Sequence, residues 1–536
     1  MKLNRFSFRK SIVSASIIIL SLILIVFLHN IYTQRHKGYS AAKNKLNVLV
    51  NVLNYINEDY FEPVELDKLM EGAIGGVLDE LDPHSVYIPS GELKEISEQL
   101  KGEFQGIGIE FDVLNGNLTV IAPVADSPSE HVGLLSGDQI IKIDKKDAFG
   151  ITKEGVFKAL RGKKGSKVTV TIKRIGTPKP FDVIIIRDNI PLYSVRTAIM
   201  LDSQTGYVWL TRFSETSLYE VKSAMSELSQ KGMQRLVLDL RNNSGGLLTQ
   251  AAEIANLFIS KTDTLVYTRG KRKELEQVFI ADPRKGNNKF PLVVLINRGS
   301  ASASEIVAGA VQDLDRGIIV GETTFGKGLV QRQISLSDGS AIRITIAQYY
   351  TPSGRLIQRE YENGHDYEYY SDMFIENREV VVDSLKKLRP KHFTRNGRVV
   401  YGGGGITPDV LSSWKSGITA ETQSLITNPN RPIFNWASKH SQSIKKDFDS
   451  FENFNTSWVL SDELYKGFLS FLISEKIEFD RSAIAEDSKY IKTRIKAQIA
   501  ATLWGRDEYY KITLPADNQV VTAVNSFKET VELIKY

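Results

Sequence analysis

The chain has 536 residues and contains no cysteine. Disulfides, thiolate metal sites, a cysteine nucleophile and a lipid-modified N-terminal cysteine are therefore excluded. The compartment stays open, because an oxidising compartment permits disulfides but does not require them. The sequence has no H-E-x-x-H motif either, and we expect neither a metal nor a cofactor.

Acidic side chains are missing from residues 1–37, which carry six basic ones. These are Lys2, Arg5, Arg9, Lys10, Arg35 and Lys37. The whole chain has a net charge of +5, so the other 499 residues sum to −1 once these six are taken off. A nucleic-acid-binding protein concentrates positive charge on its folded part, and this chain does not.

Residues 11–28 contain no charge and are rich in Ile and Leu. At about 1.5 Å per residue they extend for about 27 Å, close to the hydrocarbon thickness of a bilayer. A cleaved signal peptide is the alternative, but no small-x-small site follows the stretch. Because basic residues precede the span, we expect a cytoplasmic stub and single transmembrane anchor over 1–35. The rest of the chain then lies on the periplasmic or extracytoplasmic side of the inner membrane.

Beyond the anchor, the sequence predicts an α/β multidomain protein. Helical spacing of apolar residues dominates 40–101. Short β runs with glycines follow, beginning with a strand at 107–109, and one short helix is expected at 153–161. Strands and helices then alternate in the manner of a largely parallel sheet, with a strand at 292–296 and a helix at 303–312. A hairpin is expected between Gln333 and Tyr349, and helical spacing then returns. The expected domains are an N-terminal helical domain at 40–101, a compact β domain at 102–188, a βα-layered core at 189–410 and a helical C-terminal extension at 411–536.

One segment, Gly321–Lys327, matches the G-x-x-x-x-G-K pattern of a phosphate-binding loop. The next residue is Gly328, where the loop requires Ser or Thr for the magnesium ion. The residues after it read as a strand, whereas the loop must open a helix. Nucleotide binding is therefore not expected, and Lys327 needs another explanation.

The segment Gly299–Glu305 lies between a buried strand and a helix. Sites in parallel α/β sheets form at the carboxyl ends of strands, and a serine at a helix N-terminus has backbone N–H groups beside it. Ser302 could therefore be a nucleophile. The alternative is that Ser302-x-x-Glu305 is only a capping box.

A serine nucleophile needs a base, and residues 205–350 contain no histidine. A Ser–His–Asp arrangement would have to borrow His84 or His131 from earlier modules. A lysine kept neutral by burial is the other option. Lys327 ends the strand after the Ser302 helix, so the sheet is expected to bring the two residues together.

Six segments in this order resemble the carboxy-terminal processing, or tail-specific, serine peptidases over roughly residues 40–410. They are Leu81–Tyr87, Gly106–Gly108, Leu238–Gly246, Gly299–Glu305, Gly326–Gln331 and Gly405–Asp409. The resemblance implies a PDZ domain at 102–188, inserted before a serine peptidase core at 189–410.

By this resemblance Ser302 is the nucleophile, Lys327 the general base and Gln331 the residue that orients it. The oxyanion hole would be the N–H of Ala303 with that of Gly245 or Gly246. Some members also place an acid in the active site where this chain has Asp313, which is kept as a supporting candidate, although a solvated helix face is favoured there. Ser300 and Ser304 are interpreted as structural.

In the PDZ domain, Gly106, Ile107, Gly108 and Ile109 would form the loop that captures the C-terminal carboxylate of a substrate. Arg161 lies where related proteases couple this capture to activity, and the alternative is a solvated arginine beside Lys163 and Lys164. The expected partners are proteins with free, apolar C-terminal tails, with an adaptor or a homo-oligomer left open. The competing function is a catalytically idle PDZ scaffold that retains the peptidase fold.

Overall fold

The computed structural model describes residues 42–286, 288–361, 366–371, 378–379, 384, 388–414 and 417–534. The chain divides into two compact units, Met1–Leu81 and Asp82–Tyr536. The first unit contains a helix over 42–59 and α2 (Leu66–Asp79). In these described ranges no helix is long and apolar enough to span a bilayer, and the anchor expected at 11–28 lies outside them.

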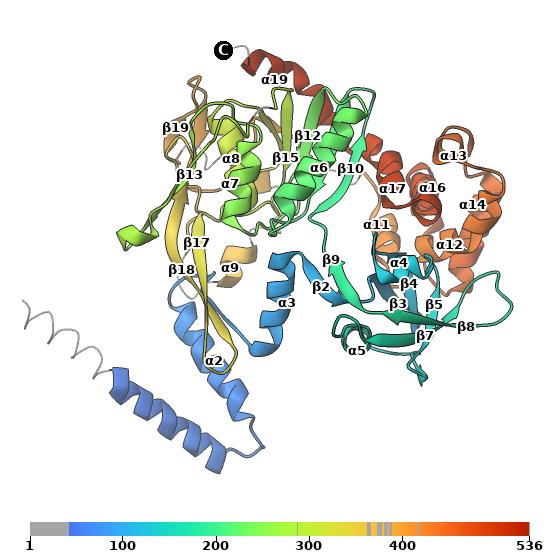
Figure 1. Cartoon of the computed structure of the whole chain (residues 1–536), viewed down its shortest axis with the longest axis horizontal. Helices are drawn as coiled ribbons and strands as arrows, with labels where there is room; N and C mark the ends of the chain where they lie inside the picture. The colour runs from blue at the N-terminus through green and yellow to red at the C-terminus, as the bar shows by residue number, and fades with distance from the viewer. Residues whose placement is uncertain are drawn as a thin grey trace, which may run out of the picture. The chain divides into compact units, whose positions relative to one another are not determined.

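A six-stranded sheet forms the centre of the second unit (Figure 1). Its strands, in spatial order, are β10 (Val195–Met200), β11 (Thr205–Leu210), β12 (Arg235–Asp239), β15 (Leu292–Ile296), β16 (Ile318–Gly321) and β21 (Val410–Leu411). All neighbours pair in parallel except β10 and β11, which are antiparallel. The expected alternation of strands and helices is confirmed.

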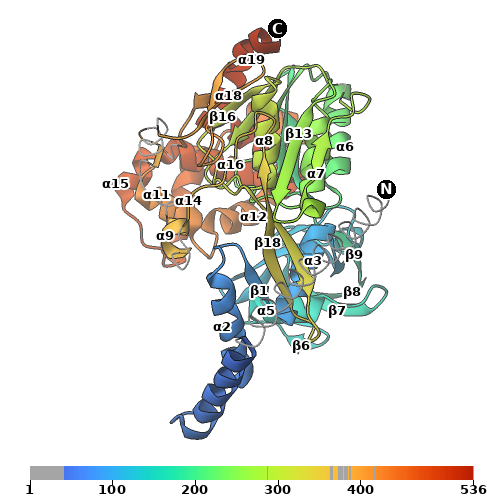
Figure 2. The same cartoon turned by 90° about the vertical axis from the view of Figure 1, so that its left-hand side faces the viewer.

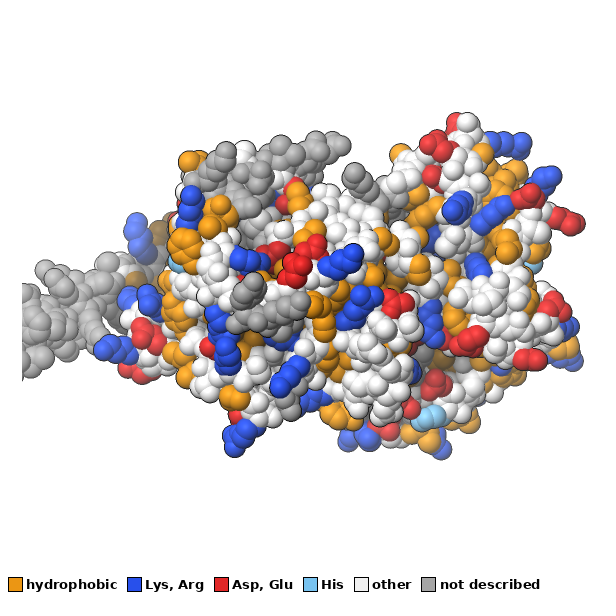
Figure 3. All heavy atoms as spheres, turned by 90° about the horizontal axis from the view of Figure 1, so that it is seen from above, with side chains coloured by type: hydrophobic (Ala, Val, Ile, Leu, Met, Phe, Trp, Pro, Cys, Tyr) orange, Lys and Arg blue, Asp and Glu red, His pale blue; other side chains and the backbone are white. Residues whose placement is uncertain are grey.

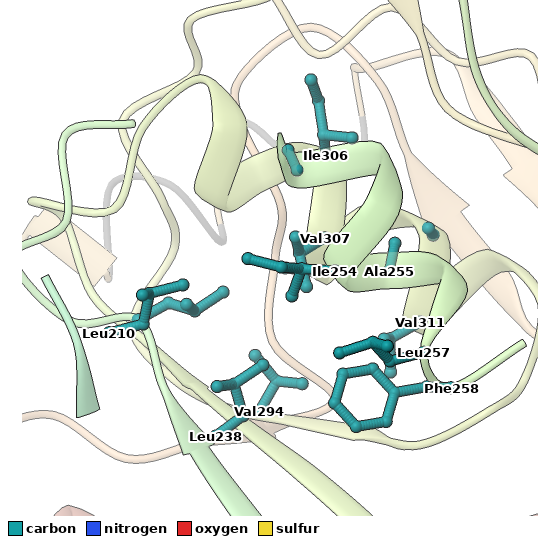
Figure 4. Close-up of a cluster of buried hydrophobic side chains, with 14 of the residues drawn as sticks. Leu210, Leu238, Ile254, Ala255, Leu257, Phe258, Val294, Ile306, Val307 and Val311 are labelled. Carbon is teal, nitrogen blue, oxygen red and sulfur yellow. The ribbon is translucent and has the colours of Figure 1, made fainter. Parts of the chain in front are cut away.

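Three helices cover one face of this sheet. They are α6 (Ser217–Gln230), α7 (Leu248–Asn256) and α8 (Ala303–Asp313). Figure 4 shows side chains of α7 and α8 directed at Leu238 of β12 and Val294 of β15, all within one buried cluster. Strands covered on both faces are apolar throughout, as β15 is, because each successive side chain enters a different core.

The opposite face of the sheet is covered by the end of the chain. Val237 and Val293 point to this side and pack with Leu514, Val520 and Phe527. The helices involved are α17 (Arg506–Thr513), α18 (Asn518–Asn525) and α19 (Phe527–Ile534). The last part of the helical extension therefore completes the core of this sheet.

A long hairpin links the sheet to the segment after Asp82. The hairpin expected between Gln333 and Tyr349 is present as β17 (Leu329–Ser335) and β18 (Ala341–Tyr350). β18 also pairs with β1 (Val86–Ile88), and Figure 2 shows these two strands together. Residues 82–88 are thus brought beside Gln331 and Thr345.

Residues 103–191 form a small β domain with its own core. Its sheet runs β3 (Ile109–Leu114), β4 (Asn117–Pro123), β5 (Gln139–Ile143), β7 (Lys167–Lys173) and β8 (Phe181–Ile186). The chain enters and leaves through an antiparallel pair, β2 (Glu103–Gly106) with β9 (Asp188–Pro191). α5 (Lys153–Leu160) is the expected helix. The strand expected at 107–109 is wrong in part, because residues 107 and 108 are a loop.

A helical bundle with a separate core precedes α17. Its helices are α11 (Ala420–Thr427), α12 (Pro432–Lys445), α13 (Phe451–Ser457), α14 (Asp462–Ser474), α15 (Arg481–Glu486) and α16 (Ser488–Trp504). Gly505, with φ 112°, separates α16 from α17. On the face drawn in Figure 3, acidic and basic side chains are interspersed rather than gathered by sign.

Candidate active site

Ser302 lies at the start of α8 in an unusual backbone conformation, with φ 54° and ψ −110°. A non-glycine residue adopts positive φ only where its surroundings hold it there. The N–H of Ser302 donates to Glu305 Oε2 at 2.8 Å. The side chain is half-buried at the carboxyl edge of the sheet, as expected for a site residue.

Glu305 is fully buried and collects hydrogen bonds from two segments of the chain. Its Oε2 also accepts from the N–H of Lys327 at 2.8 Å. Its Oε1 accepts from the Thr324 hydroxyl at 2.6 Å and from the N–H of Gly326 at 2.8 Å. Burial raises the pKa of Glu305, and these hydrogen bonds oppose the rise. The carboxylate therefore does more than cap α8: it fixes the loop that carries Lys327.

Tyr349 connects the same two residues from the other side. Its hydroxyl lies 2.7 Å from the carbonyl oxygen of Lys327 and 3.0 Å from that of Ser302. The ring is buried in the main core under α8. Glu305 and Tyr349 together hold the backbones of Ser302 and Lys327 beside each other.

The Lys327 ammonium has a pKa lowered to about 8, first by burial and then by the positive charge of Arg343. Asp82 and Glu305 act in the opposite direction. Nζ donates to Gln331 Oε1 at 2.8 Å. Within the described part of the chain, Nζ makes no hydrogen bond to Ser302 Oγ. The amine is therefore easily neutralised, but it is engaged by Gln331.

Gln331 is itself oriented by the segment 82–85. Its Nε2 donates to the carbonyl oxygen of His84. That segment is folded around Asp82, whose Oδ1 accepts from the N–H groups of His84 at 2.9 Å and Ser85 at 3.0 Å, and from the Thr345 hydroxyl at 3.1 Å. The Leu81–Tyr87 motif thus contributes to the site through its backbone.

His84 does not serve as a base for Ser302. Burial and the charge of Lys327 lower the pKa of the imidazole to about 4, although Asp82 opposes them. Its Nε2 lies 3.0 Å from the Tyr369 hydroxyl, and Nδ1 lies 3.3 Å from that of Tyr370. The histidine is therefore neutral at pH 7, and both of its ring nitrogens lie within hydrogen-bond distance of tyrosine hydroxyls. The fold brings it near Lys327, which the sequence order did not indicate.

The expected oxyanion donors lie against Ser302. A Cβ on Gly245, at φ 107°, would lie 2.9 Å from Ser302 Cβ, and one on Gly246 would lie 2.2 Å from the Phe213 carbonyl oxygen. Only glycine fits either place. The Gly245 N–H donates to Asn243 Oδ1 at 2.9 Å. No described residue accepts from the N–H groups of Gly246 or Ala303, so these two remain available to a substrate oxygen.

Two other serines near Ser302 have structural partners. Ser300 Oγ donates to the Leu240 carbonyl at 2.8 Å, and Ser304 Oγ donates to that of Asn243 at 2.7 Å. Both side chains are fully buried. They anchor the start of α8 to the glycine loop.

Asp313 is not on a solvated helix face, and that expectation is wrong. Its carboxylate is buried and accepts from Arg355 at 2.7 Å and from the N–H of Ser353 at 3.0 Å. It ends α8, about 16 Å along the axis from Ser302 at 1.5 Å per residue. The structure does not bring it beside Ser302 or Lys327.

In the β domain, the segment 106–109 connects β2 to β3. Gly108 has φ 81°, and a Cβ there would lie 2.2 Å from Ser127 Cβ. Among the described residues, none accepts from the N–H groups of Ile107 and Gly108. β3 begins at Ile109 and lies at an edge of the sheet, where a peptide can add as a strand.

Arg161 is not a solvated neighbour of Lys163 and Lys164, which corrects that alternative. It donates to Glu98 Oε2 at 2.9 Å and lies over the rings of Phe104 and Phe157. Glu98 belongs to α3 (Ser90–Lys101), which precedes the β domain. Arg161 therefore connects α5 of the β domain to a helix outside it.

The fold and this site define a serine peptidase with a PDZ domain, and comparison with known proteins gives the family. The model of peptidase family S41 matches residues 204–367, and that of the PDZ domain matches 105–185. The chain is 38% identical over 354 residues to the carboxy-terminal-processing protease of Bartonella bacilliformis, covering 65% of this chain and 80% of that protein. It therefore belongs to the carboxy-terminal-processing protease family.

The chain is also similar to other proteins. The carboxy-terminal processing protease CtpA of Bacillus subtilis is 36% identical over 325 residues, covering 60% of this chain and 69% of its own. A photosystem II D1 C-terminal processing protease of known structure is 27% identical, with a TM-score of 0.35, covering 67% and 85% of the two chains. Residues 28–91 match the N-terminal domain model of the activating protease CtpB, and 429–505 match a family of unknown function, DUF8443.

Proposed function

We propose that the chain cleaves proteins by a Ser302–Lys327 dyad after its PDZ domain has captured their C-terminal tails. The observation that carries this proposal is the joint fixation of Ser302 and Lys327 by Glu305 and Tyr349. The lowered pKa of Lys327 supports it, since a general base must be able to lose its proton near the working pH.

In this mechanism the neutral amine of Lys327 accepts the Ser302 hydroxyl proton as Oγ attacks the scissile carbonyl carbon. The tetrahedral oxyanion is stabilised by the N–H groups of Ala303 and Gly246. Lys327 returns the proton to the leaving amine, which departs and leaves an acyl-enzyme. Water then attacks the ester by the same proton transfers, and the new C-terminus is released.

Before acylation, the Lys327 amine must give up its hydrogen bond to Gln331 and form one with Ser302 Oγ. Catalytic hydrogen bonds are often loose in free enzymes and tighten only when substrate is bound. Gln331, fixed by the His84 carbonyl, then acts as the group that positions the lysine. The hydrogen bond between Lys327 and Gln331 therefore belongs to the free enzyme, and substrate binding brings the amine to Ser302 for acylation.

Substrate choice is assigned to the PDZ domain. The unoccupied N–H groups of Ile107 and Gly108 match a free carboxylate, which accepts several hydrogen bonds. The edge of β3 gives main-chain hydrogen bonds to any sequence, so selectivity rests on the last side chains. An apolar tail loses less than a charged one on leaving water.

We further propose that residues 11–28 anchor the protein in the inner membrane and that its peptidase lies outside the cytoplasm. The support is the uncharged length of the span and the basic residues before it.

The test uses the full chain in detergent with a denatured protein that ends in an apolar tail. We expect the unaltered chain to cleave it and Ser302→Ala to leave it intact. Failure of the unaltered chain on every denatured envelope protein tried would favour the idle scaffold.

A further inference from the structure

The PDZ domain is held by contacts beyond its two connections, β2 and β9. Arg161 links it to α3, as described above. On the opposite side it contacts the helical bundle of residues 420–504, the region that matches a family of unknown function. In Figure 1 the bundle helices α12 and α14 lie beside α4 (Pro128–His131) and the neighbouring strands of the PDZ sheet.

The contacts concentrate on β3 and on the turn that follows it. Asp112 Oδ2 lies 2.9 Å from Arg431 Nε, at the start of α12. Glu110 forms an ion pair with Arg506, at the junction of the bundle and α17. The Asn115 backbone N–H donates to Asn430 Oδ1 at 3.2 Å, and its side-chain amide donates to Glu475 at 2.9 Å.

These contacts use one face of the strand. Glu110 and Asp112 are two residues apart, so both side chains leave β3 on the same side. Ile109 and Phe111 alternate with them and pack into the PDZ core. The extension therefore contacts the outward face of β3. The free edge of β3 can still pair with a peptide strand.

The charges on the two sides are complementary. The PDZ strand presents Glu110 and Asp112, and Asp112 also pairs with Lys153 of α5 at 3.1 Å. Arg431 and Arg506 come from the extension and Arg196 from β10 of the peptidase sheet. The arginines keep between 37% and 43% of their side-chain surface exposed. Such pairs are individually weak and are screened by salt, so the contact is reversible.

Helix α17, whose Ile512 packs against the bundle core, is in turn bound to the peptidase sheet. Asp507 accepts from the Thr197 hydroxyl of β10 at 2.5 Å, and Tyr510 packs on Trp209 of β11. Arg241, next to the glycine loop of the site, donates to Asp517 at 2.9 Å. A chain of contacts therefore runs from the peptidase sheet through α17 to β3 of the PDZ domain.

We propose that the bundle of residues 420–504, with Arg506, is a docking platform for the chain's own PDZ domain. Through its contacts with β3, the bundle sets the direction in which a captured tail extends from the PDZ groove toward Ser302. This role rests on the proposed function. Its consequence is that the extension couples recognition of the tail to cleavage.

A distance measurement tests the docking without any substrate. Because the chain has no cysteine, Lys146→Cys in the PDZ domain and Lys466→Cys on α14 give two unique sites for spin labels. Both lysines are exposed and lie away from the contact. In the full chain we expect a narrow distance distribution. Arg431→Glu with Arg506→Glu should broaden it, as should salt at about 1 M, where the screening length is about 3 Å.

Cleavage tests the coupling. The unaltered chain is expected to cleave a free-tailed substrate about tenfold faster than the same substrate with an amidated tail. In the variant with Arg431→Glu and Arg506→Glu this ratio should fall to nearly one. The amidated substrate should be cleaved at its former rate. Arg284→Glu, which breaks an exposed ion pair with Asp282 on the peptidase core, is the matched charge control and should keep both the distance and the preference. Circular dichroism and melting temperature report whether each variant is folded.

A label distribution unchanged by the reversals overturns the docking. A broadened distribution with tail preference intact overturns the coupling. If the unaltered chain shows no tail preference, the proposed function of the PDZ domain fails, whereas the label distances still decide the docking.

Discussion

Ser302 and Lys327 are joined through their backbones, not through their side chains. Both N–H groups donate to the same atom, Glu305 Oε2, and both carbonyl oxygens lie within hydrogen-bond distance of the Tyr349 hydroxyl. The Lys327 side chain meanwhile donates to Gln331. The backbones of Ser302 and Lys327 are thus held together in the free protein, and in the proposed mechanism only the lysine amine has to move.

Glu305→Gln should disable this frame. The new amide would place its own N–H groups opposite the N–H donors of Ser302, Gly326 or Lys327, leaving buried donors unpaired at about 1–3 kcal/mol. We expect a lower melting temperature and at least about tenfold slower hydrolysis, a loss of about 1.4 kcal/mol of transition-state stabilisation.

Glu322→Gln is the matched control. Glu322 is equally buried, but it accepts from the Trp414 N–H and from Arg298 instead of the dyad loop. It should lower stability and leave kcat/KM of the folded protein nearly unchanged. Equal activity losses in the two variants would mean that Glu305 acts only on stability.

The activity should rise with pH through the pKa of Lys327. The lysine must be neutral to accept a proton, and its pKa is about 8, so kcat/KM is low at pH 6 and levels off above about pH 9. Arg343 is one cause of the lowered pKa. Arg343→Gln should therefore move the midpoint to higher pH, while Arg332→Gln, exposed on β17, should not. A midpoint that stays in place with Arg343→Gln would contradict this origin of the shift.

Tail recognition should depend on the free carboxylate. Amidating the C-terminus of a substrate, or appending two aspartates, is expected to slow cleavage at least about tenfold, or about 1.4 kcal/mol. Deleting residues 102–188 should remove the difference, whatever it does to the basal rate. Equal rates for amidated and free tails would show that the PDZ domain does not read the terminus.

The anchor predicts an unprocessed N-terminus. Mass spectrometry of protein from the membrane fraction should find peptides from residues 1–10. A mature N-terminus beyond residue 28, in a protein released from membranes, would refute the anchor and favour a cleaved signal peptide.

The order of strands and helices could be predicted because apolar spacing is local. The limits of β15 and α8, and the hairpin of β17 and β18, follow from short stretches of sequence. The pair Ser302 and Lys327 was accessible for the same reason, since parallel strands end at one edge of a sheet.

The support around that pair was not accessible. From the sequence, Glu305 is interpreted only as a capping residue. Its hydrogen bonds to Thr324, Gly326 and Lys327 span about twenty residues and cannot be read from local spacing. Asp313 was misplaced since its partner, Arg355, comes from a loop forty-two residues later. The sequence predicts the helices after residue 505 only as part of an extension of unknown role, but Leu514 and Phe527 pack against one face of the sheet. Such long-range contacts leave no periodic signal in a single sequence.

The dyad is tested most directly by the hydrolysis rates of Ser302→Ala, Lys327→Ala and the double variant on one free-tailed peptide. Residues that act as a unit give non-additive losses, so the double variant should be no slower than either single one. Lys327→Arg should be as inactive, because a guanidinium does not deprotonate in a protein. Losses that multiply in the double variant, or hydrolysis that survives Lys327→Arg, would contradict a Ser302–Lys327 mechanism.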